Sequence, residues 1–257
     1  MASQLDPTTF LPTGFLEMRE GNYVDPNGYP LIPPKLEGVR IFSKGLEDIR
    51  LFSNPVSKKL RFIATIVDYS PVGRNRMMVG TYVPDQLEYR DCVVVVPPNP
   101  DSWCEKNWIP IVDASGDEWF IYSWSPMQVG YVDIATNQLV IERVFDETTN
   151  VPLFAKVRGS SNFVDHADPH FLVGLVHFSE EHTPRHYYHM LVLLEKATLR
   201  PVAYSDAFVF ETHGIEFCLG MVREKDTYGF WISRHDRDPT LVWIPVDEIR
   251  ICFDLGR

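Results

Sequence analysis

The stretch that decides the fold is Gly45-Leu46-Glu47-Asp48-Ile49-Arg50-Leu51-Phe52, followed by Lys59-Leu60-Arg61-Phe62-Ile63-Ala64-Thr65. Both segments have the apolar content of β-strands, yet the first also carries charge. Side chains alternate along a strand, so we expect Asp48 and Arg50 on one face and Glu47 on the other. Two interpretations follow for Asp48 and Arg50. They line a surface that binds an anionic substrate, or they form an ion pair that only fixes the strand register.

Short apolar strands separated by turns recur in four units along the chain. Units of roughly forty to fifty residues made of antiparallel strands are typical of a β-propeller, although a β-sandwich gives a similar pattern. The expected strands are 60–68 and 76–83; 108–112, 119–124, 129–134 and 138–143; 171–178, 187–195 and 201–205; and 215–222, 229–234 and 241–245. The sequence therefore predicts an all-β propeller.

The first 44 residues are rich in proline, glycine and asparagine, which favours extended chain and turns over helix. We expect residues 1–44 to form an N-terminal arm and residues 45–257 to form the propeller domain. A fifth blade would combine this arm with the C-terminal strand 249–253 and so close the ring. With 257 residues and 45% hydrophobic content, the chain can bury one large core.

The net charge of −11 argues against nucleic acid or an anionic membrane as the main partner. The four cysteines have no C-x-x-C spacing, so neither a zinc site nor a disulfide framework is indicated. The first 20 residues do not look like a signal peptide, and no apolar run has the length of a bilayer span. We therefore predict a cytoplasmic protein without membrane insertion, and its oligomeric state stays open.

Several separated blocks resemble, in order, the five-bladed β-propeller carbohydrate-active enzymes. The similarity is to mannoside phosphorylases, to β-mannosyltransferases and to glycosyltransferase-associated propeller domains, and it extends over residues 45–249. The blocks are G-L-E-D-I-R-L-F, E-K-N-W-I-P-I with F-I-Y-S-W, V-R-G-S-S, Y-Y-H-M-L-V-L-L, and D-A-F-V-F-E with G-I-E-F-C-L-G. The chain departs from the phosphorylase pattern at Ile49 and at Ser123-Trp124, which weakens the expectation of phosphorolysis.

This resemblance implies a five-bladed propeller that acts as a glycosyltransferase without a cofactor. The partners would be a sugar donor, either a nucleotide sugar or a sugar phosphate, and a glycan acceptor, with mannose as the favoured sugar. A glycoside phosphorylase or hydrolase of the same fold is the first alternative. A propeller that binds a glycan or a protein without catalysis is the second.

Glycosyl transfer needs a carboxylate for proton transfer and cations that hold the anionic group. Asp48 is the preferred catalytic residue and Glu47 is the second choice. By the resemblance, Arg50, Lys106 and Arg158 hold the donor phosphate, while Asn107 and Ser160 bind sugar hydroxyls. Lys106 and Arg158 also fit a simple reading as surface turn residues.

Six histidines lie between His166 and His189, but their placement does not fit a compact ligand set, so we expect no metal ion. His177 and His189 are predicted to face the central channel, with a buried core histidine as the alternative. Glu216 is predicted to bind acceptor hydroxyls or to neutralise a central cation, with an inter-blade salt bridge as the alternative. Aromatic residues could form a stacking floor for a sugar or belong to the inter-blade core. These are Trp108, Trp124, Tyr187 and Tyr188.

Overall fold

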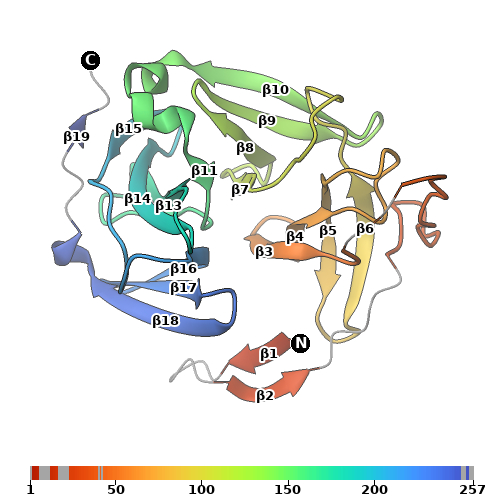
Figure 1. Cartoon of the computed structure of the whole chain (residues 1–257), viewed down its shortest axis with the longest axis horizontal. Coiled ribbons are helices and arrows are strands. Elements are labelled where there is room, and N and C mark those ends of the chain that lie inside the picture. The colour runs from red at the N-terminus through yellow and green to blue at the C-terminus, as the bar shows by residue number, and fades with distance from the viewer. Residues whose placement is uncertain are drawn as a thin grey trace.

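The computed structural model describes residues 2–5, 12–16, 23–39, 41, 43–249 and 253–254. Four antiparallel sheets surround a common axis as the blades of a β-propeller (Figure 1). The helical elements of the described residues are three short 3-10 turns, η1 (Asp146–Asn150), η2 (Pro152–Ala155) and η3 (Val246–Glu248). None of these helices has the length and apolar character needed to cross a membrane. The prediction of an all-β propeller is confirmed.

The blades follow one another in chain order, and each runs from an inner strand at the axis to an outer edge. The first blade contains β3 (Glu47–Asn54), β4 (Lys59–Ile66), β5 (Arg76–Val83) and β6 (Glu88–Val94). The second contains β7 (Ile109–Val112), β8 (Glu118–Trp124), β9 (Met127–Asp133) and β10 (Gln138–Phe145). The third contains β11 (Arg158–Gly159), β12 (Val164–Asp165), β13 (Phe171–Glu180), β14 (His186–Glu195) and β15 (Pro201–Tyr204). The fourth contains β16 (Glu216–Glu224), β17 (Thr227–Arg234) and β18 (Asp238–Pro245).

The expectation of five blades is wrong, because the described residues form four. The C-terminal strand β19 (Phe253–Asp254) pairs with β15 and so extends the third blade. The N-terminal strands β1 (Ala2–Leu5) and β2 (Pro12–Leu16) pair with each other as a separate hairpin. In Figure 1 this hairpin lies below the blades, in the region between β18 and β3. The strands predicted to build a fifth blade already satisfy their backbone hydrogen bonds elsewhere.

Apolar side chains fill the spaces between neighbouring blades. One cluster joins the first and second blades through Phe52, Ile63 and Phe120, and it includes Trp108. Further clusters join the second to the third blade and the third to the fourth. The second and third sheets therefore bury both faces, which explains why their strands read as nearly continuous apolar runs rather than strict alternation.

Part of the predicted arm packs against the outer edge of the first blade. Tyr23 pairs with Tyr89 of β6, and the Val24 N–H donates to the Tyr89 carbonyl over 3.1 Å. The Cys92 N–H in turn donates to the Val24 carbonyl over 2.8 Å. These contacts cover an exposed strand edge. The division of the chain at residues 44 and 45 stays a prediction.

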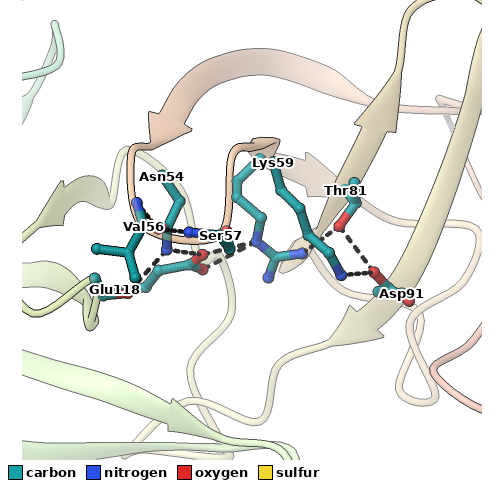
Figure 2. A network of polar contacts seen from close by, with 9 residues as sticks. Asn54, Val56, Ser57, Lys59, Thr81, Asp91 and Glu118 are labelled. Carbon is teal, nitrogen blue, oxygen red and sulfur yellow. Dashed lines mark hydrogen bonds and ion pairs between the residues drawn. The ribbon is translucent and has the colours of Figure 1, made fainter.

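A polar network ties the first blade to the second (Figure 2). The Arg61 Nε lies 2.9 Å from the nearer oxygen of Glu118, and the Asn54 amide donates to that same oxygen over 3.2 Å. Arg61 also donates to the Thr81 hydroxyl over 2.8 Å, and this hydroxyl donates to Asp91 over 2.9 Å. The Arg61 and Glu118 side chains are only 12% and 19% exposed, so the pair is largely shielded from water.

We expect Glu118→Ala to lower the free energy of unfolding by about 2 kcal/mol, because it leaves Arg61 without its carboxylate and removes one of the two acceptors of the Asn54 amide. Chemical denaturation with urea measures the change. Glu142→Ala, at an exposed position of β10, removes the same charge and serves as the matched control. Equal urea concentrations at the midpoint of unfolding for the two variants would show that the network adds nothing to stability.

Candidate functional site

The buried side chain of Arg50 in β3 contacts residues of all three other blades or of the segments that lead into them. Arg50 is 2% exposed, and its guanidinium donates three hydrogen bonds. Its Nε donates to the Ser160 carbonyl over 2.8 Å, Nη2 to the Asn107 side-chain oxygen over 3.2 Å, and Nη1 to the Asp48 carbonyl over 3.1 Å. The guanidinium also lies over the ring of Phe217 in β16, 5.9 Å from its centroid. Arg50 thus joins the first blade to the other three.

The charge of Arg50 is not neutralised by an ion pair among the described residues. Burial lowers its pKa to about 10, and the negative charge of Asp48 partly opposes that shift. The side chain therefore stays protonated at neutral pH. An arginine has five N–H donors, so the three bonds leave one N–H on each terminal nitrogen. The structure places a fixed positive charge on the axis.

The two residues that bond to Arg50 from the same side have unusual backbone conformations. Asp48 has φ 51° and Asn107 has φ 64°, in the left-handed region that few non-glycine residues adopt. The β3–β4 pairing shifts register between Glu47 and Arg50, so a bulge breaks the alternation expected for Asp48 and Arg50. As a result Arg50 bonds to the carbonyl of Asp48, not to its carboxylate. Backbone strain of this kind persists where the surroundings enforce it, and it often marks functional sites.

Asp48 is half-buried and Glu47 is exposed, so both carboxylates can reach solvent.

In β11, Arg158 lies directly opposite His177 of β13. The next residue must be glycine, because a Cβ at Gly159 would lie 2.3 Å from the Asn107 carbonyl oxygen. This close approach brings the third blade against the segment that precedes β7.

Ser160 is fully buried and serves as a second link between blades. Its hydroxyl donates to the Cys218 carbonyl of β16 over 2.6 Å, while its own carbonyl accepts from Arg50. Asn107 is also buried, at 6% exposure. Ser160 and Asn107 therefore hold Arg50 in place, and their predicted contact with sugar hydroxyls stays a prediction.

His177 lies beside Arg50 under two aromatic rings. It is 5% exposed, its ring stacks on Tyr187 at 5.7 Å, and it meets the edge of Phe217 at 4.9 Å. Burial holds the pKa of His177 well below its ordinary value, so the ring is neutral at physiological pH. Its Nδ1 has no hydrogen-bond partner. The neighbouring charges that add to this shift, in decreasing order, are those of His189, Arg50, Lys106 and Arg158.

The positive charges of Lys106 and Arg158 add to the lowering of the His177 pKa that burial causes. Both side chains are exposed, and Arg158 uses Nη1 for the Val157 carbonyl at 3.0 Å. Arg158 is also the cross-strand neighbour of His177. Arg50 lies beside the backbone of Asp48, and the shared binding of a donor phosphate by Arg50, Lys106 and Arg158 stays a prediction.

Two residues predicted to bind substrate are engaged elsewhere. Tyr188 stacks on Phe178 at 5.1 Å and packs into the core between the second and third blades. The Glu216 carboxylate is buried and accepts three backbone N–H groups, from residues 210–212, at 2.9 to 3.2 Å. It forms neither of the contacts expected for it with a cation, but fixes the segment that joins the last two blades.

His189, like Ser160, has 0% exposure, and neither of its ring nitrogens has a hydrogen-bond partner among the described residues. It lies opposite His177 in the β13–β14 ladder, and its ring packs near Phe210 at 4.9 Å. Burial lowers the pKa of His189 to about 3. The alternative of a core histidine describes its surroundings.

Two aromatic residues of the site were not selected from the sequence. Phe217 was not considered, and Tyr187 entered only as one of four aromatic candidates, two of which, Trp108 and Trp124, are buried core residues. The alternation of β14 carried a usable signal, because Tyr187 shares a face with His189 whereas Tyr188 does not. No group of His, Cys, Asp and Glu side chains in the described part of the chain could hold a metal ion.

Comparisons with known proteins show the fold. No family model and no curated protein matches the sequence. Among solved structures, the β-1,2-mannobiose phosphorylase from Listeria innocua matches with a TM-score of 0.56 at 14% identity, over 85% of this chain and 62% of that one. A glycosyl hydrolase from Bacteroides ovatus matches with a TM-score of 0.50 at 11% identity, over 89% of this chain and 73% of that one. An exo-β-1,3-galactanase from Phanerochaete chrysosporium matches with a TM-score of 0.51 at 10% identity, over 82% of this chain and 48% of that one. The chain thus spans less than two thirds of the phosphorylase.

We expect Arg50→Lys to lower the free energy of unfolding by about 3 kcal/mol. An ammonium keeps the charge but cannot span the three acceptors that the planar guanidinium reaches. Urea denaturation measures the loss. Lys59→Arg, a substitution at an exposed position of β4, is the control for the effect of exchanging lysine and arginine at a site without buried acceptors. A variant as stable as the unmodified protein would contradict the role of Arg50 as the link between blades.

We expect the protein to lose stability as the pH falls from about 6.5 towards 3. The unfolded chain binds a proton at His189 in this range whereas the folded chain does not, so protonation favours unfolding. At pH 5 the loss from one such histidine is about 2 kcal/mol. His189→Leu should therefore be less sensitive to acid in unfolding measurements at pH 7.5 and 5. His170→Leu, at an exposed position, is the control, and parallel curves for all three proteins would refute this account.

Proposed function

We propose that the chain is a carbohydrate-active enzyme that transfers a glycosyl group from a phosphorylated donor to a glycan acceptor. The observation that carries this proposal is the buried Arg50 guanidinium beside the backbone of Asp48, with Arg158 opposite the buried His177 in the β11–β13 pairing. Arg50 is buried without an ion pair among the described residues, so its positive charge at the axis can be balanced by a bound anion. A sugar phosphate or the diphosphate of a nucleotide sugar provides that anion.

The three cations would divide the work of binding the donor. Arg50 contributes mainly its field, because its position is fixed by hydrogen bonds to the protein. Lys106 and Arg158 are exposed and can bring their donors to the phosphate oxygens. Such positive charges stabilise the negative charge that develops on the leaving phosphate during transfer.

Asp48 would act as the base that completes the transfer. As the bond forms between the acceptor oxygen and the anomeric carbon, the acceptor hydroxyl gives its proton to the Asp48 carboxylate. The bond between that carbon and the donor oxygen breaks, and the phosphate leaves with the electron pair. In the reverse direction protonated Asp48 is the acid, so the same site could run as a phosphorylase.

The fold similarity supports carbohydrate as the substrate class, since the phosphorylase from Listeria innocua is in complex with β-1,2-mannobiose. Mannose is accordingly the sugar that we propose to test first. Hydrolysis in the same fold is the main alternative chemistry. It would need no phosphate, so the dependence of turnover on a phosphorylated donor separates the two.

We expect Asp48→Asn to reduce turnover about 10²- to 10⁴-fold while donor binding is retained, since an amide cannot accept the proton. The assay incubates the protein with GDP-mannose or mannose 1-phosphate and manno-oligosaccharide acceptors, and it detects products by chromatography. Thermal shift measures donor binding in parallel. Glu47→Gln is the matched control, and we expect it to keep most of its activity.

The opposite pattern would overturn the proposal. Stabilisation by a glycan without turnover, unchanged in Asp48→Asn, would identify a propeller that binds sugar without catalysis. Turnover of oligosaccharide without phosphate would identify a hydrolase. Loss of activity in Glu47→Gln alone would move the catalytic role from Asp48 to Glu47.

A further inference from the structure

A cavity of about 780 Å³ lies where the inner strands lead away from Arg50. Residues 47–50 of β3 belong to the candidate site, whereas residues 51–53 line this cavity. The same change occurs along the fourth blade, where residues 216–218 are beside the site and residues 222–223 line the cavity. Since a strand rises about 3.3 Å per residue, the cavity lies at the other end of the axis.

The floor of this cavity is apolar and is contributed by several blades. Its apolar lining includes Leu51, Ile111, Phe163 and Leu172. Leu51 is 46% exposed, which is unusual for a leucine on an inner strand. The volume falls within the range of roughly 300 to 1,000 Å³ found for small-ligand pockets.

The rim of the cavity is positively charged, although the whole chain carries a net charge of −11. The lining contains three basic residues, Lys196, Arg223 and Lys225, and one acidic residue, Asp165. Its net charge is therefore 3 − 1 = +2. Lys196 pairs with Asp165. The charges of Arg223 and Lys225 are in no ion pair among the described residues.

Hydrogen bonds to backbone carbonyls fix the position of the Arg223 side chain. Its Nη1 donates to the His166 carbonyl over 2.7 Å, and Nε lies 3.3 Å from the carbonyl oxygen of Lys225. These bonds fix the guanidinium without neutralising it, and Nη2 donates to none of the described residues. Lys225 is exposed on the turn that follows β16. A planar cation and a flexible cation therefore lie together above an apolar floor.

We propose that this cavity binds a small amphipathic anion, with its carboxylate or phosphate at Arg223 and Lys225 and its apolar body over the floor around Leu51. The site is separate from the candidate catalytic site. It requires neither Asp48 nor the chemistry proposed there. A ligand at this end of the axis contacts the same inner strands that hold Arg50.

The test uses 1-anilinonaphthalene-8-sulfonate, an apolar ring system with one negative charge, whose fluorescence reports binding. We expect decanoate and decyl phosphate to displace it and decanol to displace it at least tenfold less well. The two anions then distinguish a carboxylate ligand from a phosphate ligand. Asp48→Asn should bind the probe like the unmodified protein, so this result is independent of the proposed enzymatic activity.

Arg223→Gln/Lys225→Gln should weaken probe binding at least tenfold. Lys35→Gln/Lys156→Gln removes the same charge from exposed positions outside the cavity and should leave binding unchanged. Because Arg223 also supports backbone, Leu51→Asp provides a second variant that places negative charge on the floor at a half-exposed position. Equal affinity in all these proteins, or displacement by decanol as effective as by decanoate, would overturn the proposal.

Discussion

The buried guanidinium of Arg50 is the interaction on which the ring depends. From the first blade it reaches the segment before β7, the carbonyl after β11 and the ring of Phe217 on β16. Removing a cation from water is costly, and a buried charge without a carboxylate partner recovers that cost only through well-formed hydrogen bonds. The three acceptors fit the planar fork of an arginine. Close packing at Gly159 keeps one of the acceptor segments within reach.

The same charge shapes the chemistry of the axis. It contributes to keeping His177 neutral, and it orients the carbonyl of Asp48 through a bulge with left-handed backbone. Strain of this kind, of order 1–3 kcal/mol per residue, requires a scaffold that over-determines the conformation. The inter-blade clusters and the Arg61–Glu118 network provide such a scaffold. Stability at the blade interfaces thus supports an otherwise unfavourable arrangement at the centre.

The sequence predicted the strands well because sheets that pack between two neighbouring blades bury both faces and therefore read as apolar runs between turns. It missed β6, whose Glu88, Arg90 and Asp91 obscure the pattern at the outer edge of a blade. It could not predict that β19 joins β15, since pairing between distant segments leaves no local signal. The choice of Tyr188 over Tyr187 shows how one residue reverses the face of a strand. Arg50 could be selected as important from its apolar surroundings, but two of its three acceptors are backbone carbonyls, which carry no sequence signature.

The number of blades also bears on where ligands can bind. Four inner strands leave less room around the axis than five, and here Arg50 with its acceptors occupies that space. In the proposed function, the donor and acceptor would then approach from one end of the axis rather than lie along it. The two ends consequently differ in chemistry, with Asp48 and three cations at one and a cation-rimmed apolar bowl at the other. Since both are built on the same four inner strands, a shift of these strands at one end would be felt by the hydrogen bonds of Arg50 at the other.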